Sequence, residues 1–358
     1  MATYKILAIN PGSTSTKIAV YKNENLVYGK SIRHEHDQLC RFDKVAHQFE
    51  FRRDLILKEL SDHSIQLSDF DAVVGRGGLL KPISSGVYEV NEAMKRELYE
   101  GRQGEHASNL GALIADEIAK MIPRCKAFIA DPVVVDELMP IARISGHPAF
   151  QRISIFHALN QKAVAKNYAR KAGIPYDKLN LIVAHLGGGI SVGAHYMGRV
   201  VDVNNALDGE GPFSPERSGT LPIFALAKLC FGGAYTLEQV NKMVVGGGGL
   251  VAHLGTNQFA TVCQWVEEGR EDAKLIVDAM AYQISKSIGS MAVTLRGKVD
   301  AILITGGMAY NTPFVKSIIN QVGFIAPVEV YPGEDEMLAL AMNGLEVLLG
   351  HEVAKQYV

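Results

Sequence analysis

The sequence predicts an α/β protein made of two similar domains that face each other across a central cleft. The chain of 358 residues is longer than a single hydrophobic core usually supports. Strand-like segments alternate with helix-like segments, and one arrangement of three strands occurs twice. With 47% apolar and 21% charged residues, the composition is that of a folded globular protein with a large core.

The first three-strand unit begins near the N-terminus. Tyr4 to Asn10 and Lys17 to Tyr21 are expected to be strands, joined by the loop "PGSTST". The turn "NEN" then leads into a third strand, Leu26 to Ile32. The same plan recurs from Leu179 to Val203, where an apolar strand, a glycine-rich loop, a second strand, the turn "YMG" and a third strand follow one another. The two copies share their architecture rather than their letters.

Helix-like segments follow each three-strand unit, and a break in the chain between the two units sets the expected domain boundary. Pro140 and the stretch "SGHP" interrupt the chain before the second unit. We expect the first domain to span residues 1–143 and the second 144–339, with a C-terminal helix in 340–358 that packs back on the first. The expected helices are Asn91–Tyr99, Ala107–Met121, Ala158–Ala172, Pro222–Cys230, Asp272–Leu295 and Glu336–Leu349.

Charge and targeting signals narrow the classes of partner. The net charge of −2 and the pI near 6.6 predict no general attraction to nucleic acid or to a membrane surface. The N-terminal sequence lacks a signal-peptide pattern and no apolar run is long enough for a membrane span, so we expect a cytoplasmic protein. The four cysteines form no CxxC pair and are expected to be reduced, buried thiols: Cys40, Cys125, Cys230 and Cys263.

Two loops are candidates for binding phosphate. The first carries backbone amides and hydroxyls after Asn10, with Lys17 adding charge, and these groups suit phosphate oxygens. A plain hydrophilic hairpin is the alternative for this loop taken alone. Three consecutive glycines clear side chains from the matching loop of the second copy, so the pair favours two phosphate-binding elements. The residues assigned to them are Asn10, Ser13, Ser15 and Lys17 in the first loop and Gly187, Gly188 and Gly189 in the second.

Several common active-site motifs are missing from the sequence. It contains no GxxxxGK[ST] phosphate loop, and Gly187–Gly193 does not fit a GxGxxG fingerprint that opens a helix. HExxH is also missing, and the one match to GxSxG, Gly189–Gly193, runs from the glycine-rich loop into an expected strand rather than into a helix. A dehydrogenase and a hydrolase are therefore disfavoured.

Longer segments carry a family resemblance. The chain is similar to the superfamily of acetate and sugar kinases, Hsp70 and actin, and within it resembles the butyrate kinase branch of the acetate kinase family. The segments that match, in order, are "INPGSTSTKIAV", "VVGRGGLL", "ADPVVVDELMP", "RISIFHALNQKAVA", "AHLGGGISV", "DVNNALDGEGPFSPERSGTLP" and "ITGGMAYN".

This resemblance implies a fold and an activity. The fold would be two duplicated ribonuclease H-like, or actin-like ATPase, domains, the second of them binding nucleotide. The activity would be reversible phosphoryl transfer between ATP and butyrate, with Mg²⁺ and an acyl phosphate product, in a homo-oligomer. Acetate, propionate or branched acids remain alternatives as substrate, and a non-catalytic, nucleotide-dependent clamp is the alternative from another class.

The implied catalytic groups are cationic or carry hydrogen-bond donors. A carboxylate nucleophile is already ionised at neutral pH and needs no general base, but it must approach a polyanion. The resemblance assigns Arg217 to both the transferring phosphoryl group and the substrate carboxylate, and assigns His157 and His185 to the phosphoryl group. Arg76, between glycines, is the candidate for the substrate carboxylate.

The resemblance also implies metal and nucleotide ligands. Asp131 and Glu336 match carboxylates associated with Mg²⁺, although the neighbours Glu334 and Asp335 leave the second assignment open. The loop expected near the nucleotide contains Gly306, Gly307 and Asn311.

One segment departs from the family pattern. The run "TNQFATV" has Gln258 where an acid is usual and Ala260 or Thr261 where an arginine is usual, which puts nucleotide affinity in question. The histidines of "RHEH", Arg33–His36, are expected to be solvated, and Trp265 is expected to belong to a helix core.

Overall fold

The computed structural model describes residues 2–358, which divide into two compact units. Unit 1 holds residues 2–135 and 335–358, and unit 2 holds Asp136–Glu334. The chain therefore enters unit 2 after Val135 and returns to unit 1 after Glu334, where the sequence suggested boundaries at 143 and 339. None of the helices within residues 2–358 has the length and apolarity that a membrane crossing requires.

Unit 1 is built on a seven-stranded mixed sheet in the order β12-β5-β6-β4-β1-β2-β3. β1, β2 and β3 form the antiparallel meander, and β1, β4 and β6 run parallel. The strands are β1 Lys5–Pro11, β2 Ser15–Lys22, β3 Asn25–Arg33, β4 Ala72–Arg76, β5 Val87–Glu89, β6 Lys126–Ala130 and β12 Lys355–Gln356. The helices are α1 His36–Leu39, α2 Phe49–Asp62, α3 Glu92–Glu100, α4 Asn109–Lys120 and α12 Glu336–Leu348, with 3₁₀ turns η1 Val45–Gln48 and η2 Leu67–Asp69.

Unit 2 is built on a five-stranded sheet in the order β11-β10-β7-β8-β9. Again the first three strands form an antiparallel meander, and β7, β10 and β11 run parallel. The strands are β7 Asn180–Leu186, β8 Ile190–Tyr196, β9 Arg199–Val203, β10 Ala301–Gly306 and β11 Val328–Pro332. The helices are α5 Ala158–Ala172, α6 Ile223–Phe231, α7 Leu237–Val244, α8 Gly249–Leu254, α9 Phe259–Glu267, α10 Glu271–Thr294 and α11 Thr312–Val322, with η3 Pro140–Arg143, η4 Tyr176–Lys178 and η5 Gly307–Tyr310.

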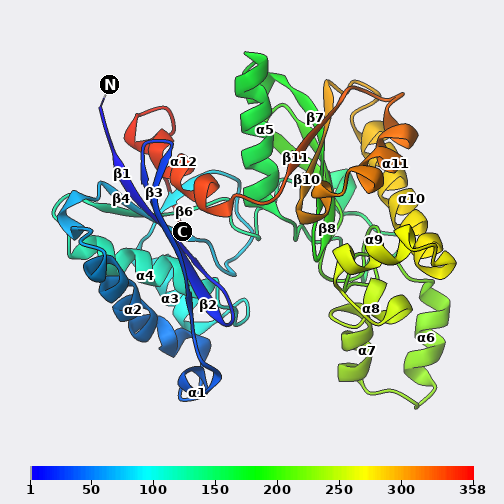
Figure 1. Ribbon diagram of the computed structural model, residues 1–358, viewed down its shortest axis with the longest axis horizontal. Coiled ribbons are helices and arrows are strands. Elements are labelled where there is room, and N and C mark those ends of the chain that lie inside the picture. Colours follow the sequence, from blue (N-terminus) through cyan, green and yellow to red (C-terminus); the bar gives the residue numbers. More distant parts are fainter. Residues whose placement is uncertain (1) are drawn as a thin grey trace. The chain divides into compact units, whose positions relative to one another are not determined.

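The two sheets repeat one topology. The order β3-β2-β1-β4-β6 in unit 1 corresponds strand by strand to β9-β8-β7-β10-β11 in unit 2. The helix that follows the last of these strands in each repeat, however, packs on the sheet of the other unit. α5 follows the last shared strand of unit 1 but packs on β7 and β10, and α12 follows β11 but packs on β1 and β4 (Figure 1). The internal duplication expected from the two meanders is therefore confirmed by strand order.

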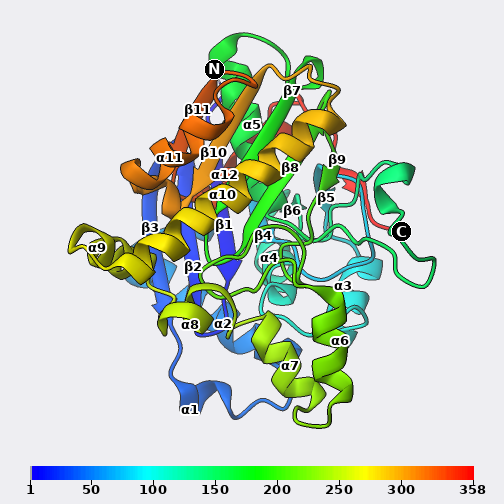
Figure 2. The same ribbon diagram turned by 90° about the vertical axis from the view of Figure 1, so that its right-hand side faces the viewer.

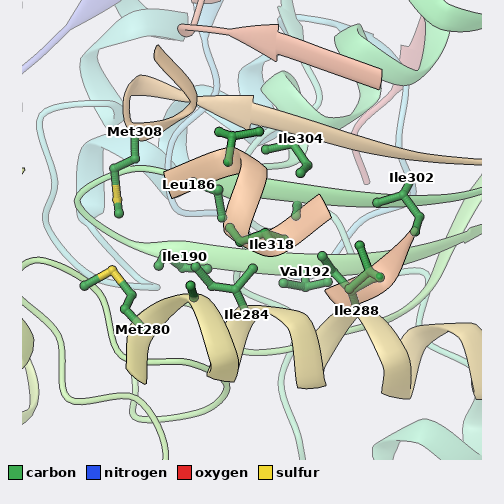
Figure 3. Close-up of a cluster of buried hydrophobic side chains, with 14 of the residues drawn as sticks. Leu186, Ile190, Val192, Met280, Ile284, Ile288, Ile302, Ile304, Met308 and Ile318 are labelled. Carbon is green, nitrogen blue, oxygen red and sulfur yellow. The ribbon is translucent and has the colours of Figure 1, made fainter. Parts of the chain in front are cut away.

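Each central strand is buried on both faces because helices cover both sides of its sheet. In β7, Leu181 and Val183 pack with α5, whereas Ile182, Ala184 and Leu186 face the opposite side. That side is covered by α10, which crosses β7 and β8 in Figure 2. Figure 3 shows Leu186, Ile190 and Val192 of the sheet directed at Met280, Ile284 and Ile288 of α10.

The elements expected from periodicity are present: α5 has the expected bounds, Ala158–Ala172, and the other expected helices differ by one or two residues at their ends. The helices α1, α2, α7, α8 and α11 and the strands β4, β5, β6, β11 and β12 were not expected individually. Trp265 lies on α9 and packs against the core of unit 2, as expected. The cysteines are free, but the expectation that all are buried was wrong, because Cys40 and Cys230 are exposed.

A close backbone approach joins β4 to α4. A Cβ atom added at Gly75 would lie 2.2 Å from the carbonyl oxygen of Gly111, well inside van der Waals contact. Only glycine at both positions allows the helix to pack this close to the strand that ends at Arg76.

We predict that Gly75→Ala destabilises unit 1 by about 3 kcal/mol, because the added methyl group must displace α4. The urea midpoint of unfolding measures the effect. Gly146→Ala is the matched control, since its Cβ would have no neighbour within 4 Å. Equal midpoints for the two variants would contradict the packing argument.

Candidate active site

In unit 1, polar side chains gather where parallel strands end. Asn10 lies near the end of β1, Arg76 ends β4, and Asp131 follows β6, all at the carboxyl edge of the sheet. Glu336, the first residue of α12, accepts hydrogen bonds from Asn10 Nδ2 at 2.6 Å and from Arg76 Nη1 at 3.1 Å. Arg76 Nη1 also lies 3.3 Å from Asn10 Oδ1. The edge therefore brings an amide, a guanidinium and a carboxylate into direct contact.

A buried arginine binds the β1–β2 loop from its buried side. Arg52 of α2 is 1% exposed, and its guanidinium donates to the carbonyl oxygens of Gly12 at 2.7 Å and Ser13 at 3.2 Å. It also donates to Thr16 Oγ1 at 3.2 Å, and burial lowers its pKa to about 10. Because the carbonyl groups turn inward toward this cation, Ser13 stays exposed at the loop tip.

Asp131 combines burial with unusual backbone geometry. Its side chain is 2% exposed, and Oδ1 accepts a hydrogen bond from the backbone N–H of Gly86 at 2.7 Å. Its φ angle is +37°, a conformation that costs free energy for a residue other than glycine. Such strain is typical of residues held in place for function.

Two stacked histidines form the centre of the candidate site in unit 2. The rings of His157 and His185 lie 3.8 Å apart between centroids and 12° from parallel. His185, near the end of β7, contacts Asn160 Oδ1 through Nδ1 at 2.8 Å and Glu334 Oε1 through Nε2 at 3.1 Å. His157 Nδ1 lies 2.9 Å from the hydroxyl of Ser191 on β8.

Arg217 lies directly on the triple-glycine loop. A Cβ atom at Gly189 would lie only 1.9 Å from Arg217 Nη1, so any side chain there would displace the guanidinium. Arg217 Nη1 donates to the carbonyl oxygen of Ala206, and Ser214 Oγ donates to that of Gly188. Burial lowers the pKa of Arg217, while the nearby Glu216 acts in the opposite direction. An arginine with an ordinary pKa above 12 stays charged even when it is partly desolvated.

The loop after β10 contains the remaining residues that the sequence predicted for the site. Gly306 ends the strand with φ of +95°, and a Cβ there would lie 2.3 Å from the carbonyl oxygen of Leu186. Next to it, a Cβ at Gly307 would meet nothing within 4 Å. Asn311 caps α11 by accepting from the backbone N–H of Phe314 at 2.9 Å.

Comparison with known proteins decides the family. Residues 151–354 match the model of the acetokinase family. The chain is 56% identical over 354 residues to butyrate kinase 2 of Clostridium acetobutylicum, covering 99% of each chain. A probable butyrate kinase of Phocaeicola vulgatus is 56% identical over 346 residues, covering 97% of each.

This chain belongs to the acetokinase family. Acetate kinase of Porphyromonas gingivalis aligns with 96% of this chain and all of its own at a TM-score of 0.79 and 18% identity. Acetate kinase of Entamoeba histolytica gives 0.75 at 18% identity, covering 96% and 99% of the two chains. These likenesses confirm the expected α/β fold of duplicated actin-like ATPase domains.

The residues assigned from the family pattern fall into two groups, one in each unit. In unit 1 the structure brings Asn10, Arg76 and Glu336 together, with Asp131 at the same sheet edge. In unit 2 it brings the two histidines, Gly187 and Gly189 together with Arg217. Asn311 is committed to its helix cap through Oδ1. Their roles in an acetokinase reaction remain predictions.

Several contact residues were missed by sequence reasoning. Arg52 sits in "FEFRRDL", a charged stretch that gave no sign of a buried cation. Glu334 was considered only as a competing alignment for Glu336, yet it contacts His185. Ser191 follows the glycines in the same quoted motif and could have been noticed as a polar residue at the start of β8.

The segment that departs from the family pattern borders the glycine loop. Gln258 precedes α9, and its side-chain amide donates to Asn257 Oδ1 at 3.1 Å. Asn257 in turn donates to Glu216 Oε2 at 3.3 Å. Glu216 is the residue before Arg217, so the side-chain amides of Gln258 and Asn257 are linked to Arg217 through the Glu216 carboxylate.

The expectation that the histidines near Arg33 are solvated was wrong for His34. It is 5% exposed, and its Nε2 lies 2.8 Å from Thr16 Oγ1 beside the Arg52 cluster. Burial, followed by repulsion from Arg52, lowers the pKa of His34 to about 4. The ring is therefore neutral at physiological pH and supports the β1–β2 loop.

We predict that His34 makes stability depend on pH below about 6.5, the pKa of an unfolded histidine. The folded pKa of about 4 is lower, so the unfolded state binds more protons between these values. The contribution is complete above pH 6.5 and is lost at about 1.4 kcal/mol per unit as the pH falls toward 4.

Urea unfolding of the wild type and His34→Asn at pH 7.5 and pH 5 measures this, and the variant should show the smaller pH effect. An NMR titration of the His34 ring with a midpoint near 6.5 would contradict it.

Proposed function

We propose that this protein is a butyrate kinase, which transfers the γ-phosphoryl group of ATP to butyrate and runs in reverse from butyryl phosphate and ADP. A carboxylate oxygen forms the new bond to phosphorus while the bond to the β–γ bridging oxygen breaks and its electrons leave with ADP. The observation that carries the proposal is the Arg217 guanidinium seated on the Gly187–Gly189 loop in a chain 56% identical to butyrate kinase 2.

Charge repulsion is the main barrier that the residues must lower. Butyrate is ionised at neutral pH, so no side chain has to remove a proton from it. The transferring group spreads charge over its equatorial oxygens, and fixed cations stabilise that charge best when they need no reorganisation. Arg217 meets this need, because its position is set by the carbonyl oxygen of Ala206 and by the glycine loop beneath it.

The stacked histidines supply directional donors. His185 is 1% exposed and held by Asn160, so its ring orientation is fixed before a ligand arrives. His157 is fixed in the same way by Ser191. We assign both rings to hydrogen bonds with oxygens of the transferring phosphoryl group, with the contact of His185 Nε2 to Glu334 as the arrangement in the absence of substrate.

Unit 1 supplies a second set of anion ligands. Ser13 and Lys17 are exposed on the β1–β2 hairpin, and Arg52 fixes the hairpin from its buried side. We assign the loop from Asn10 to Lys17 to phosphate oxygens of ATP. We assign Arg76 to the butyrate carboxylate, with its contact to Glu336 as the arrangement in the absence of substrate.

The carboxylates in unit 1 suit a magnesium ion bound together with nucleotide. Residues 2–358 contain no group of three or more histidines, cysteines or acids that could form a metal cage. Mg²⁺ keeps several waters and needs only one or two carboxylates besides substrate phosphates, which fits Asp131 and Glu336. Bound there, Mg²⁺ would neutralise phosphate charge.

Burial of the acid's alkyl chain can provide only a modest preference among short-chain acids. Each additional methylene contributes about 0.8 kcal/mol, so two of them favour butyrate over acetate by only about fifteenfold. Propionate, isobutyrate and acetate are therefore alternative substrates to be compared directly. A nucleotide-dependent clamp would bind ATP and transfer nothing.

We further propose that the enzyme acts in the cytoplasm as a homo-oligomer and makes ATP from butyryl phosphate during fermentation. Acyl phosphates donate readily to ADP, which supports the ATP-forming direction. The net charge of −2 supports small anionic substrates held by local cations, with neither nucleic acid nor membrane as a partner.

We predict that acyl phosphate formed from ATP and Mg²⁺ and trapped with hydroxylamine is greatest with butyrate. Acetate, propionate, isobutyrate and valerate at the same subsaturating concentration are the comparison. A maximum at another acid would keep the kinase and change its substrate. ATP binding without product from any acid would support the clamp instead.

We also predict that Arg217→Ala lowers turnover about a thousandfold or more, the usual effect of removing an arginine from a phosphoryl-transfer site. The fold should stay intact, because Arg217 is a half-buried loop residue outside the helices and strands of unit 2. Arg270→Ala, which removes an exposed arginine paired with Asp272, is the control and should keep wild-type turnover. Unchanged turnover in Arg217→Ala would remove this residue from the mechanism.

A further inference from the structure

A chain of buried hydrogen bonds leads from His195 through Gln161 and Ser191 to His157. We propose that Gln161 and Ser191 are positioning residues that fix His157 as the tautomer with its proton on Nε2, so that this nitrogen donates to the phosphoryl group. The functional part of this inference rests on the phosphotransferase activity proposed above. The tautomer itself follows from contacts within unit 2.

The orientation of the Gln161 amide is decided by a backbone carbonyl. Gln161 is 0% exposed, and its Nε2 lies 3.1 Å from the carbonyl oxygen of Ser191, which can only accept. The opposite orientation would place two acceptor oxygens against each other. Gly193 of β8 leaves room for the amide, because a Cβ there would lie 2.6 Å from Gln161 Oε1.

This orientation determines the partner on the other side of the amide. Gln161 Oε1 lies 3.0 Å from His195 Nε2, so His195 carries a proton on Nε2 and donates it to the amide oxygen. Burial, together with the nearby charge of Lys162, lowers the pKa of His195 to about 3. A neutral His195 with a protonated Nε2 is the state consistent with both facts.

The remaining amide proton fixes the Ser191 hydroxyl. Gln161 Nε2 donates to Ser191 Oγ at 2.8 Å, which makes this oxygen an acceptor. Among residues 2–358, the polar partners of that hydroxyl are Gln161 Nε2 and His157 Nδ1, and Ser191 is 0% exposed. Its single hydrogen therefore points to His157 Nδ1 at 2.9 Å. A nitrogen that accepts carries no proton, so the proton of neutral His157 resides on Nε2.

The tautomer decides whether His157 presents a hydrogen-bond donor or a lone pair at Nε2. With the proton on Nε2, His157 presents a donor to an anionic oxygen, whereas the other tautomer would present a lone pair and repel it. The hydrogen bond to Ser191 also holds the ring flat against His185. Gln161 and Ser191 thus act on the reaction only through His157.

The first test leaves Gln161 and Ser191 unchanged. Protein labelled with ¹⁵N in histidine is studied by two-bond ¹H–¹⁵N correlation at pH about 8.5, above the ordinary histidine pKa of about 6.5. His157→Gln identifies the His157 signals. An unprotonated Nδ1 with a protonated Nε2 is expected, and a protonated Nδ1 in any form overturns the proposal. This result does not depend on which acid the enzyme phosphorylates.

The second test removes the amide. Gln161→Met should release the preference for the Nε2 tautomer and lower kcat about tenfold or more, with KM for ATP changed less than about twofold. Gln264→Met, the same substitution at an exposed glutamine that donates to Glu268, is the control. A lower kcat with an unchanged tautomer would mean a merely structural role and would overturn the proposal.

The third test changes the hydroxyl, and it also applies if Gln161→Met does not fold. Ser191→Thr keeps a donor for Nδ1 and should retain the tautomer and most of kcat. Ser191→Ala removes the donor and should lose both. Equal behaviour of the two variants would overturn the proposal.

Discussion

Parallel pairing of one central strand in each unit is the constraint on which the candidate site depends. β1 pairs with β4, and β7 pairs with β10, so the strand ends that carry chemistry meet at one edge of each sheet. The antiparallel partner of each strand then turns back at that same edge, which places a loop beside it. Asn10 and Arg76 meet in unit 1 for this reason, and His185 lies beside the glycine loop in unit 2.

The two arginines that lie against these loops are held in a similar way. Arg52 and Arg217 donate to backbone carbonyl oxygens, which carry only partial negative charge. A carbonyl group fixes a guanidinium without cancelling its net charge, whereas a carboxylate would neutralise it. The protein therefore holds positive charge next to each loop before any anionic ligand is bound.

The sequence was sufficient for the meanders, the long helices and the family, because alternating strands, helical periodicity and the glycine-rich loops are local signals. β4 and β6 were harder, since strands buried on both faces read as short apolar runs with no alternation. Arg52, His34 and Gln161 could not be recognised, because their partners lie far along the chain or depend on burial. A polar residue acquires its role there only when the fold removes water from it.

The exchange of α5 and α12 has a consequence for how the protein is made. Every strand of the unit 1 sheet except the edge strand β12 precedes unit 2 in sequence, yet one face of that sheet is covered by α12, residues Glu336–Leu348, almost at the end of the chain. During synthesis, the face of the unit 1 sheet that α12 covers therefore stays exposed until nearly the whole chain has been made. Unit 2 receives α5 before its own first strand emerges, so the later half of the chain is able to finish folding first.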